Sequence, residues 1–174
     1  SKKRANLLPW KKITKITLNT KKIINIAIIG KYVNLKDAYK SLDEALTHGG
    51  ISNNVKVNLI RIESDKLKSK QITKKLKNIS GLLIPGGFGK RGTEGKIAAI
   101  RYARERKIPF LGICFGMQMA IIEFARNKLN IKKAGSTELN KNCYPVVGLI
   151  NEWNKDGKII KGTDKDLGGT MRLG

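Results

Sequence analysis

Short apolar runs, several of them ended by glycine, alternate along this chain with segments of helical periodicity. Residues 23–29 are a nearly continuous apolar run that stops at Gly30, as expected of a strand buried on both faces. Shorter runs at residues 55–60, 81–85 and 108–113 predict three further strands. The order of these runs constrains the fold more than any other feature of the sequence.

Three segments between or after these strands have the periodicity of helices. The first begins at Asp37, a good N-cap residue, and is expected to stop at Gly49 and Gly50. The others cover residues 94–107 and 117–125. Strands that alternate with helices predict an α/β fold with a mostly parallel sheet, helices on both faces and right-handed crossovers.

The two ends of the chain give weaker signals. Residues 1–22 are polar and basic with one apolar anchor at 7–10, which predicts a linker rather than part of the domain. Residues 144–150 predict one more strand, and a glycine-rich tail follows. At 174 residues the chain is long enough for one domain with a sizeable core.

Composition excludes several classes of protein. A hydrophobic fraction of 40% argues against disorder, and no apolar stretch approaches the roughly 20 residues that a membrane span needs. No sustained apolar run follows the basic start, so a secretory signal is not expected and the predicted location is cytoplasmic. Two cysteines and one histidine, without a CxxC pattern, predict no metal site.

The net charge of +23 suggests nucleic-acid binding, because lysine and arginine neutralise phosphates. The lysines are, however, scattered along every segment, and only 6% of residues are aromatic, so no base-stacking platform is indicated. We therefore expect a solvated surface charge and no nucleic-acid partner. A basic nucleic-acid-binding module remains an alternative, with a steep salt dependence as its signature.

One motif suggests a catalytic cysteine. Gly112, Cys114 and Gly116 form a Gly-x-Cys-x-Gly motif between a predicted strand and a predicted helix. This is the cysteine form of a nucleophile elbow, a turn so tight that only small residues fit two positions before and after the nucleophile. The dipole of the following helix favours a thiolate. The backbone N–H of Phe115 and the Gly86-Gly87 loop could supply oxyanion donors.

A free cysteine is more often a small buried hydrophobic residue than a catalyst, and the motif by itself is a weak signal. The strand before it, the helix after it and the glycine loop at the preceding strand favour a catalytic origin for Cys114. Cys143 has no such surroundings and is expected to be structural.

Longer strings of residues resemble one branch of the class I glutamine amidotransferases, the amidotransferase domain of the CTP synthase family. The resemblance runs in order from about residue 23 to the last residue. The strings that carry it are residues 30–33, 37–41, 44–46, 85–89, 91–92, 94–97, 101–105, 109–118, 136–138, 144–147, 152–153 and 168–174.

That resemblance implies a fold and an activity. The fold is the flavodoxin-like architecture of class I amidotransferases. The enzyme makes CTP from UTP, ATP with Mg²⁺ and L-glutamine, is activated by GTP and assembles as a homotetramer, with no cofactor in the amidotransferase domain itself.

The resemblance also implies site residues. Cys114 forms the glutamyl thioester; Gly87 and Phe115 form the oxyanion hole; Gly87, Phe115, Gly116, Met117, Gln118 and Glu138 bind glutamine; and a mobile lid near Lys158–Arg172 includes Gly168, Gly169 and Arg172.

Two departures from the family pattern matter. Phe115 stands where the family usually has leucine, which puts a larger side chain near the pocket. The His-Pro-Glu string that holds the family's triad histidine and glutamate does not occur, and His48 resembles a structural helix end with a capping or packing role. The synthetase domain is also absent, so we expect a linker at 1–22 and a partial amidotransferase domain at 23–174 that is inactive alone.

Two further alternatives stay open. The chain could be a degenerate, non-catalytic amidotransferase-like domain kept for assembly or regulation. It could also be a cysteine hydrolase of a related elbow-bearing fold that acts on other amides or electrophiles.

Overall fold

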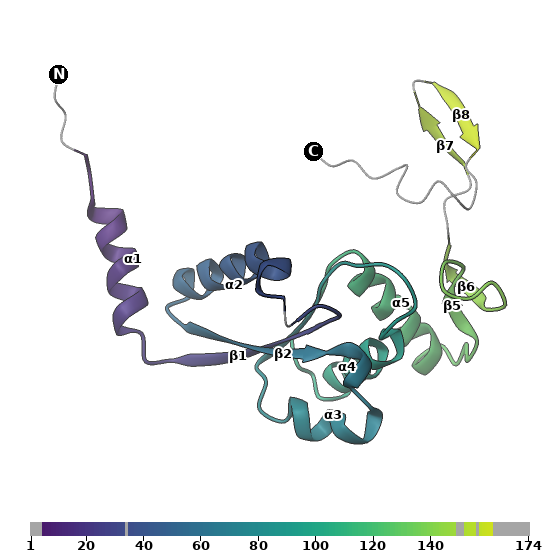
Figure 1. The fold of residues 1–174 in the computed structure, drawn as a ribbon, viewed down its shortest axis with the longest axis horizontal. Coiled ribbons are helices and arrows are strands. Elements are labelled where there is room, and N and C mark those ends of the chain that lie inside the picture. The colour runs from purple at the N-terminus through teal and green to yellow at the C-terminus, as the bar shows by residue number, and fades with distance from the viewer. Residues whose placement is uncertain (1–4, 34, 149–151, 156, 162–174) are drawn as a thin grey trace. The chain divides into compact units, whose positions relative to one another are not determined.

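The computed structural model describes residues 5–33, 35–148, 152–155 and 157–161. The chain divides at residue 120 into two compact units, and each is described by itself. Figure 1 shows the ribbon with its helices and strands labelled.

The first unit is built on a four-stranded parallel sheet. Its strands are β1 (Ile23–Gly30), β2 (Lys56–Glu63), β3 (Gly81–Ile84) and β4 (Phe110–Gly112), in the order β2-β1-β3-β4. All three pairings are parallel. All four predicted strands are therefore present, and their carboxyl ends meet at one edge, where open α/β sheets bind ligands.

Helices cover both faces of this sheet, as the alternating pattern predicted. Helix α2 (Lys40–Ser52) packs on β2, and α3 (Ser69–Leu76) lies on the opposite side in Figure 1. Helix α4 (Thr93–Glu105) packs against α3 and against β1 and β3. Coverage on both faces explains why β3 is buried along its whole length and reads as a continuous apolar run.

The predicted limits of α2 were wrong at both ends. Asp37 lies in a short 3₁₀ turn (Lys36–Tyr39) before the helix, and no side-chain cap is formed. At the other end α2 continues through Gly49 and Gly50 to Ser52. A Cβ at Gly50 would lie 2.7 Å from Val57 Cγ2 and 2.8 Å from Val55 O, so this glycine allows close packing and does not stop the helix.

Two helices were not expected from the sequence. Residues 8–19 form α1 (Leu8–Asn19), with proline in its first turn and no buried residue. The interdomain role of residues 1–22 stays a prediction. Helix α3 follows a 3₁₀ turn (Ser64–Lys66) after β2 and completes the crossover to β3.

The second unit contains the C-terminal part of a helix and, in its described residues, short strands. Helix α5 (Phe115–Asn127) begins in the first unit, and β5 (Ala134–Ser136) pairs in parallel with β6 (Tyr144–Val147). β6 lies where the fifth strand was predicted. Where a loose tail was expected, β7 (Glu152–Lys155) and β8 (Lys158–Lys161) form an antiparallel hairpin.

The two glycines of α2 give a matched test of packing. We expect Gly49→Ala to stabilise the protein by about 0.5–1 kcal/mol, because alanine favours helix and a Cβ there meets nothing within 4 Å. We expect Gly50→Ala to destabilise it by about 1–3 kcal/mol, because the new methyl overlaps Val57 and the Val55 carbonyl. Urea unfolding followed by circular dichroism measures both, and equal effects would contradict this account of Gly50.

Candidate active site

Cys114 occupies a sharp turn between β4 and α5. Its φ of +49° is in the left-handed region, which a non-glycine residue adopts at a cost of about 1–2 kcal/mol. Backbone bonds hold the turn on both sides: Ile113 N–H donates to Ile84 O (2.9 Å), and Gln118 N–H donates to Cys114 O (3.2 Å). The Cys114 side chain is exposed at the start of α5. This is the geometry of a nucleophile elbow.

The glycines on either side of the elbow have no room for a side chain. A Cβ at Gly112 would lie 2.7 Å from the carbonyl carbon of Gly116, and a Cβ at Gly116 would lie 2.1 Å from Ile84 O. Both obstacles are backbone atoms, which cannot rotate away. The Gly-x-Cys-x-Gly spacing is therefore a steric requirement of this turn.

The loop that follows β3 approaches the elbow. A Cβ at Gly86 would lie 3.6 Å from Cys114 Cβ, so the two strand ends are in direct contact. Gly87 is half-buried, and a Cβ there would meet nothing within 4 Å. The structure thus brings the start of the Gly86-Gly87 loop next to Cys114.

The Phe115 side chain, which the sequence predicted to be a larger group near the pocket, is buried. The ring is only 1% exposed. Lys96 Nζ lies 4.7 Å and Lys31 Nζ 5.8 Å from its centroid, within the range of cation–π contacts. The ring belongs to the core beneath the elbow.

A pocket of about 330 Å³ lies beside this loop. It is lined by Lys31, Tyr32, Ala38, Tyr39, Gly86, Gly87, Phe88 and Lys96. Two lysines among its eight lining residues give it a positive charge. Sequence reasoning had assigned only the Gly86-Gly87 loop from this set to the site.

The comparisons with known proteins agree with this geometry. The family model described as "Glutamine amidotransferase class-I" matches residues 34–174. The chain belongs to the class I glutamine amidotransferases. The elbow, the adjoining glycine loop and the parallel sheet are thus features of a known family fold.

Similar proteins carry a more specific name. A CTP synthase from Pelagibacter ubique (strain HTCC1062) is 78% identical over 174 residues, which are 100% of this chain and 32% of that protein. A CTP synthase from Azospirillum brasilense is 53% identical over 98% of this chain and 32% of its own length. The chain therefore spans about a third of the length of these curated relatives.

A solved structure supports the fold. "Trypanosoma brucei CTPS - glutaminase domain with bound acivicin" matches with a TM-score of 0.66 and 36% identity, over 70% of this chain and 48% of that one. The predicted fold class, a mostly parallel sheet of the class I amidotransferase type, is confirmed.

The remaining predicted site residues have mixed positions. On α5, Gly116 is buried, Gln118 half-buried and Met117 exposed. Glu138 belongs to the second unit, where its N–H donates to Ser136 Oγ (3.3 Å). The predicted lid residues Gly168, Gly169 and Arg172 lie outside the described residues.

The structure also gives the positions of His48 and Cys143. His48 is exposed within α2, whose C-cap residue is Asn53, so neither the packing nor the capping role holds. Cys143 is half-buried against Gly135. Within the described ranges, His, Cys, Asp and Glu form no group of three or more that could hold a metal, and no helix is long and apolar enough to span a membrane.

Lys96 is the site residue that sequence reasoning missed most clearly. Its side chain is 1% exposed, and no carboxylate in the described part of the chain pairs with it. Burial, and secondly repulsion from Lys31, lower the pKa of Lys96 from 10.5 to about 8, although Asp65 acts in the opposite direction. Lys96 shares the buried stripe of α4 with Ile100 and Ala103, a spacing that could have revealed it.

Burying this ammonium should lower stability at neutral pH. The pKa of Lys96 is lower in the folded protein than in the unfolded chain, so between about pH 8 and 10.5 the unfolded state binds more protons and stability rises with pH. We expect Lys96→Met to stabilise the protein at pH 7 by up to about 3 kcal/mol, with the gain shrinking from pH 8 upward.

Urea unfolding of both proteins from pH 7 to 10 measures this difference. Lys90→Met is the control, because Lys90 is exposed and its pH dependence should match that of the unaltered protein. A Lys96→Met effect that stays constant with pH would contradict the assigned cost of the buried charge.

Proposed function

We propose that this chain is the glutamine-hydrolysing part of a CTP synthase and supplies ammonia for the ATP-dependent amination of UTP. The observation that carries the proposal is Cys114 on its left-handed elbow, with the Gly86-Gly87 loop against it. The family match supports glutamine as the substrate. The likeness of the whole chain to CTP synthases supports the amination of UTP as the reaction that uses the ammonia.

In the proposed reaction the Cys114 sulfur attacks the carboxamide carbon of glutamine. The C–S bond forms and the carbonyl oxygen becomes an oxyanion, which the N–H groups of Gly87 and Phe115 would stabilise. Phe115 suits this role because the first amides of a helix have no acceptor within the helix. When the C–N bond breaks, the amide nitrogen takes up the proton released by the thiol and leaves as ammonia. Water then hydrolyses the thioester, which gives glutamate and regenerates the thiol.

Each step of this reaction also needs a group that moves protons. In the family that group is a histidine held by a glutamate in a His-Pro-Glu string, which these 174 residues do not contain. His48 is exposed on α2. General acid–base catalysis is typically worth about 10²–10⁴ in rate, so we propose that these 174 residues alone have negligible glutaminase activity.

The wider assignments follow from the same likeness. We propose that Gly116, Met117, Gln118 and Glu138 contact glutamine and that Gly168, Gly169 and Arg172 belong to a lid. For the full-length protein we propose a homotetramer in the cytoplasm, activated by GTP, with UTP, ATP and Mg²⁺ bound by a synthetase domain.

Replacement of Cys114 tests the proposal. In the full-length protein, Cys114→Ala should lower glutamine-dependent CTP formation at least about 10³-fold, because no thioester can form. CTP formation from added ammonia should continue, since that route bypasses the thiol. The readout is CTP formed with either nitrogen donor, and Cys143→Ala should leave both rates unchanged. If Cys114→Ala keeps its glutamine-dependent rate, Cys114 is not the nucleophile.

The isolated 174-residue chain gives a second test. Ammonia release from glutamine should stay at the background level of a Cys114→Ala sample, because the proton-transfer pair is not present. Clear glutamine-dependent release that requires Cys114 would show that another group in these residues acts as the base.

A further inference from the structure

The loop from Gly86 to Gly89 has few contacts made by its own side chains. Three of its four residues are glycine, and Phe88 is 61% exposed. A Cβ at Gly87 would meet nothing within 4 Å, and Gly89 has a φ of +75°. Glycine loses more backbone freedom on ordering than any other residue. The position of this loop must therefore depend on groups that reach it from elsewhere in the fold.

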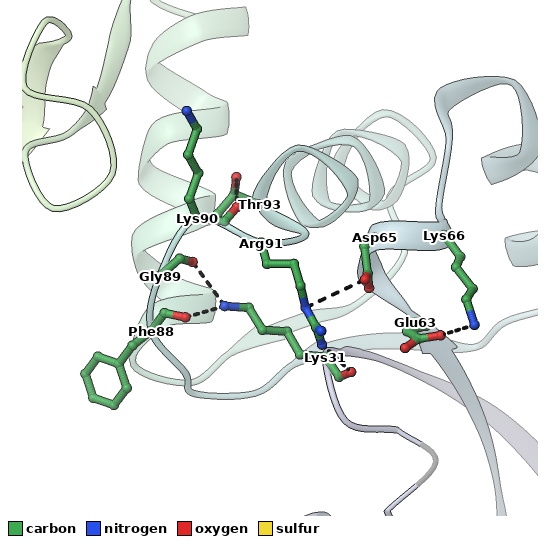
Figure 2. Close-up of polar contacts among 9 residues, drawn as sticks. All are labelled: Lys31, Glu63, Asp65, Lys66, Phe88, Gly89, Lys90, Arg91 and Thr93. Carbon is green, nitrogen blue, oxygen red and sulfur yellow. Dashed lines mark hydrogen bonds and ion pairs between the residues drawn. The ribbon is translucent and has the colours of Figure 1, made fainter.

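Lys31 is such a group. It follows β1 directly, and its ammonium donates hydrogen bonds to the carbonyl oxygens of Phe88 and Gly89, the latter at 3.1 Å (Figure 2). Hydrogen bonds from an ionised donor are about twice as strong as neutral ones. These two bonds fix the peptide units that follow Phe88 and Gly89, on the C-terminal side of Gly87.

A second contact ties the far end of the loop to the same residue. Arg91 Nη2 donates to the carbonyl oxygen of Lys31 at 3.0 Å, and Arg91 Nε pairs with Asp65 Oδ2 at 3.6 Å (Figure 2). The Arg91 guanidinium also lies 5.2 Å from the centroid of the Tyr32 ring. The loop is thus held to the end of β1 through the side chain and the backbone of Lys31.

The Lys31 ammonium also reaches the elbow. It lies 5.8 Å from the centroid of the Phe115 ring, and Phe115 is the residue directly after Cys114. Because the ring is 1% exposed and packed in the core, it gives the elbow a rigid base. One charged group therefore contacts both elements that would supply oxyanion donors.

We propose that Lys31 is a positioning residue for glutamine hydrolysis: it holds the Gly86–Gly89 loop in register with the elbow, so that the Gly87 and Phe115 amides converge on one oxyanion. The inference rests on the proposed function of Cys114. Oxyanion donors act at 2.7–3.1 Å, and a misplacement of about 1 Å can cost about 10² in rate. Since the oxyanion exists only beyond the ground state, loss of Lys31 should lower kcat more than it changes KM.

The experiment compares Lys31→Met, Lys31→Arg and Lys90→Met in the full-length protein. Lys90→Met is the matched control, because it removes a positive charge from the same segment, and Lys90 contributes only its carbonyl oxygen to the contacts in Figure 2. We expect Lys31→Met to lower kcat for glutamine hydrolysis about 10- to 100-fold with KM within about threefold. CTP formation from added ammonia should stay within about twofold of the unaltered rate, as a positioning role in glutamine hydrolysis alone requires.

Lys31→Arg distinguishes positioning from general damage. Arginine keeps the charge and several N–H donors. Lys31→Arg should therefore recover at least about a third of the decrease in log kcat that Lys31→Met causes. Cys114 alkylation by iodoacetamide should proceed at the same rate in all variants, because that reaction needs no oxyanion hole. Labelling by the chloroketone analogue of glutamine, which passes through an oxyanion, should slow in Lys31→Met in parallel with kcat.

Several results would overturn the inference. They are a Lys31→Met kcat equal to that of Lys90→Met, a change confined to KM, or an equal loss with glutamine and with ammonia. If Lys31→Met does not fold, as judged by its thermal melt, Lys31→Arg decides, and a folded Lys31→Arg below about 1% of the original kcat would count against positioning by charge. A fully active Cys114→Ala protein, by contrast, would remove the proposed function itself.

Discussion

The contact between Gly116 and the carbonyl of Ile84 is the constraint on which the rest of the site depends. It allows the first turn of α5 to press directly onto the end of β3, with a hydrogen bond from Ile113 N–H to the same carbonyl. That approach forces the left-handed backbone at Cys114 and turns the thiol out to solvent. It also brings Gly86 beside the cysteine. A single methyl group at position 116 would separate the end of β3 from α5 and disrupt the elbow at Cys114.

The second feature of the site is its positive charge. Lys31 and Lys96 both lie against the buried ring of Phe115, and their mutual repulsion contributes to the lowered pKa of Lys96. A buried cation, Lys96, with a half-buried cation, Lys31, beside it lowers stability, which a protein selected for stability alone would avoid. The net charge of +23 is therefore not only a solvated surface. Part of it lines the pocket beside the Gly86–Gly89 loop, where Lys31 and Lys96 would favour anionic groups.

Local patterns allowed part of this structure to be predicted. The apolar runs gave all four parallel strands, and the Gly-x-Cys-x-Gly spacing gave the elbow, because both depend on residues near one another in the chain. Helix α1 was missed because it buries none of its residues, and Gly50 was misread because its contact with Val57 arises only when α2 packs on β2. The sequence predicted Lys31 and Lys96 only as surface charge, because their contacts with the Phe115 ring form only in the folded structure.

This difference between local and distant contacts has a consequence for how the site can fail. The elbow is specified by three glycine and cysteine positions within five residues, so it should form whenever β3 and α5 pack together. The Gly86–Gly89 loop has no comparable local specification, since a Cβ at Gly87 would meet nothing within 4 Å and Phe88 is exposed. Its position comes from Lys31, 55 or more residues earlier in the chain, and from Arg91 bound to the Lys31 carbonyl. A protein of this design can keep a reactive thiol while losing the geometry that makes the thiol a catalyst.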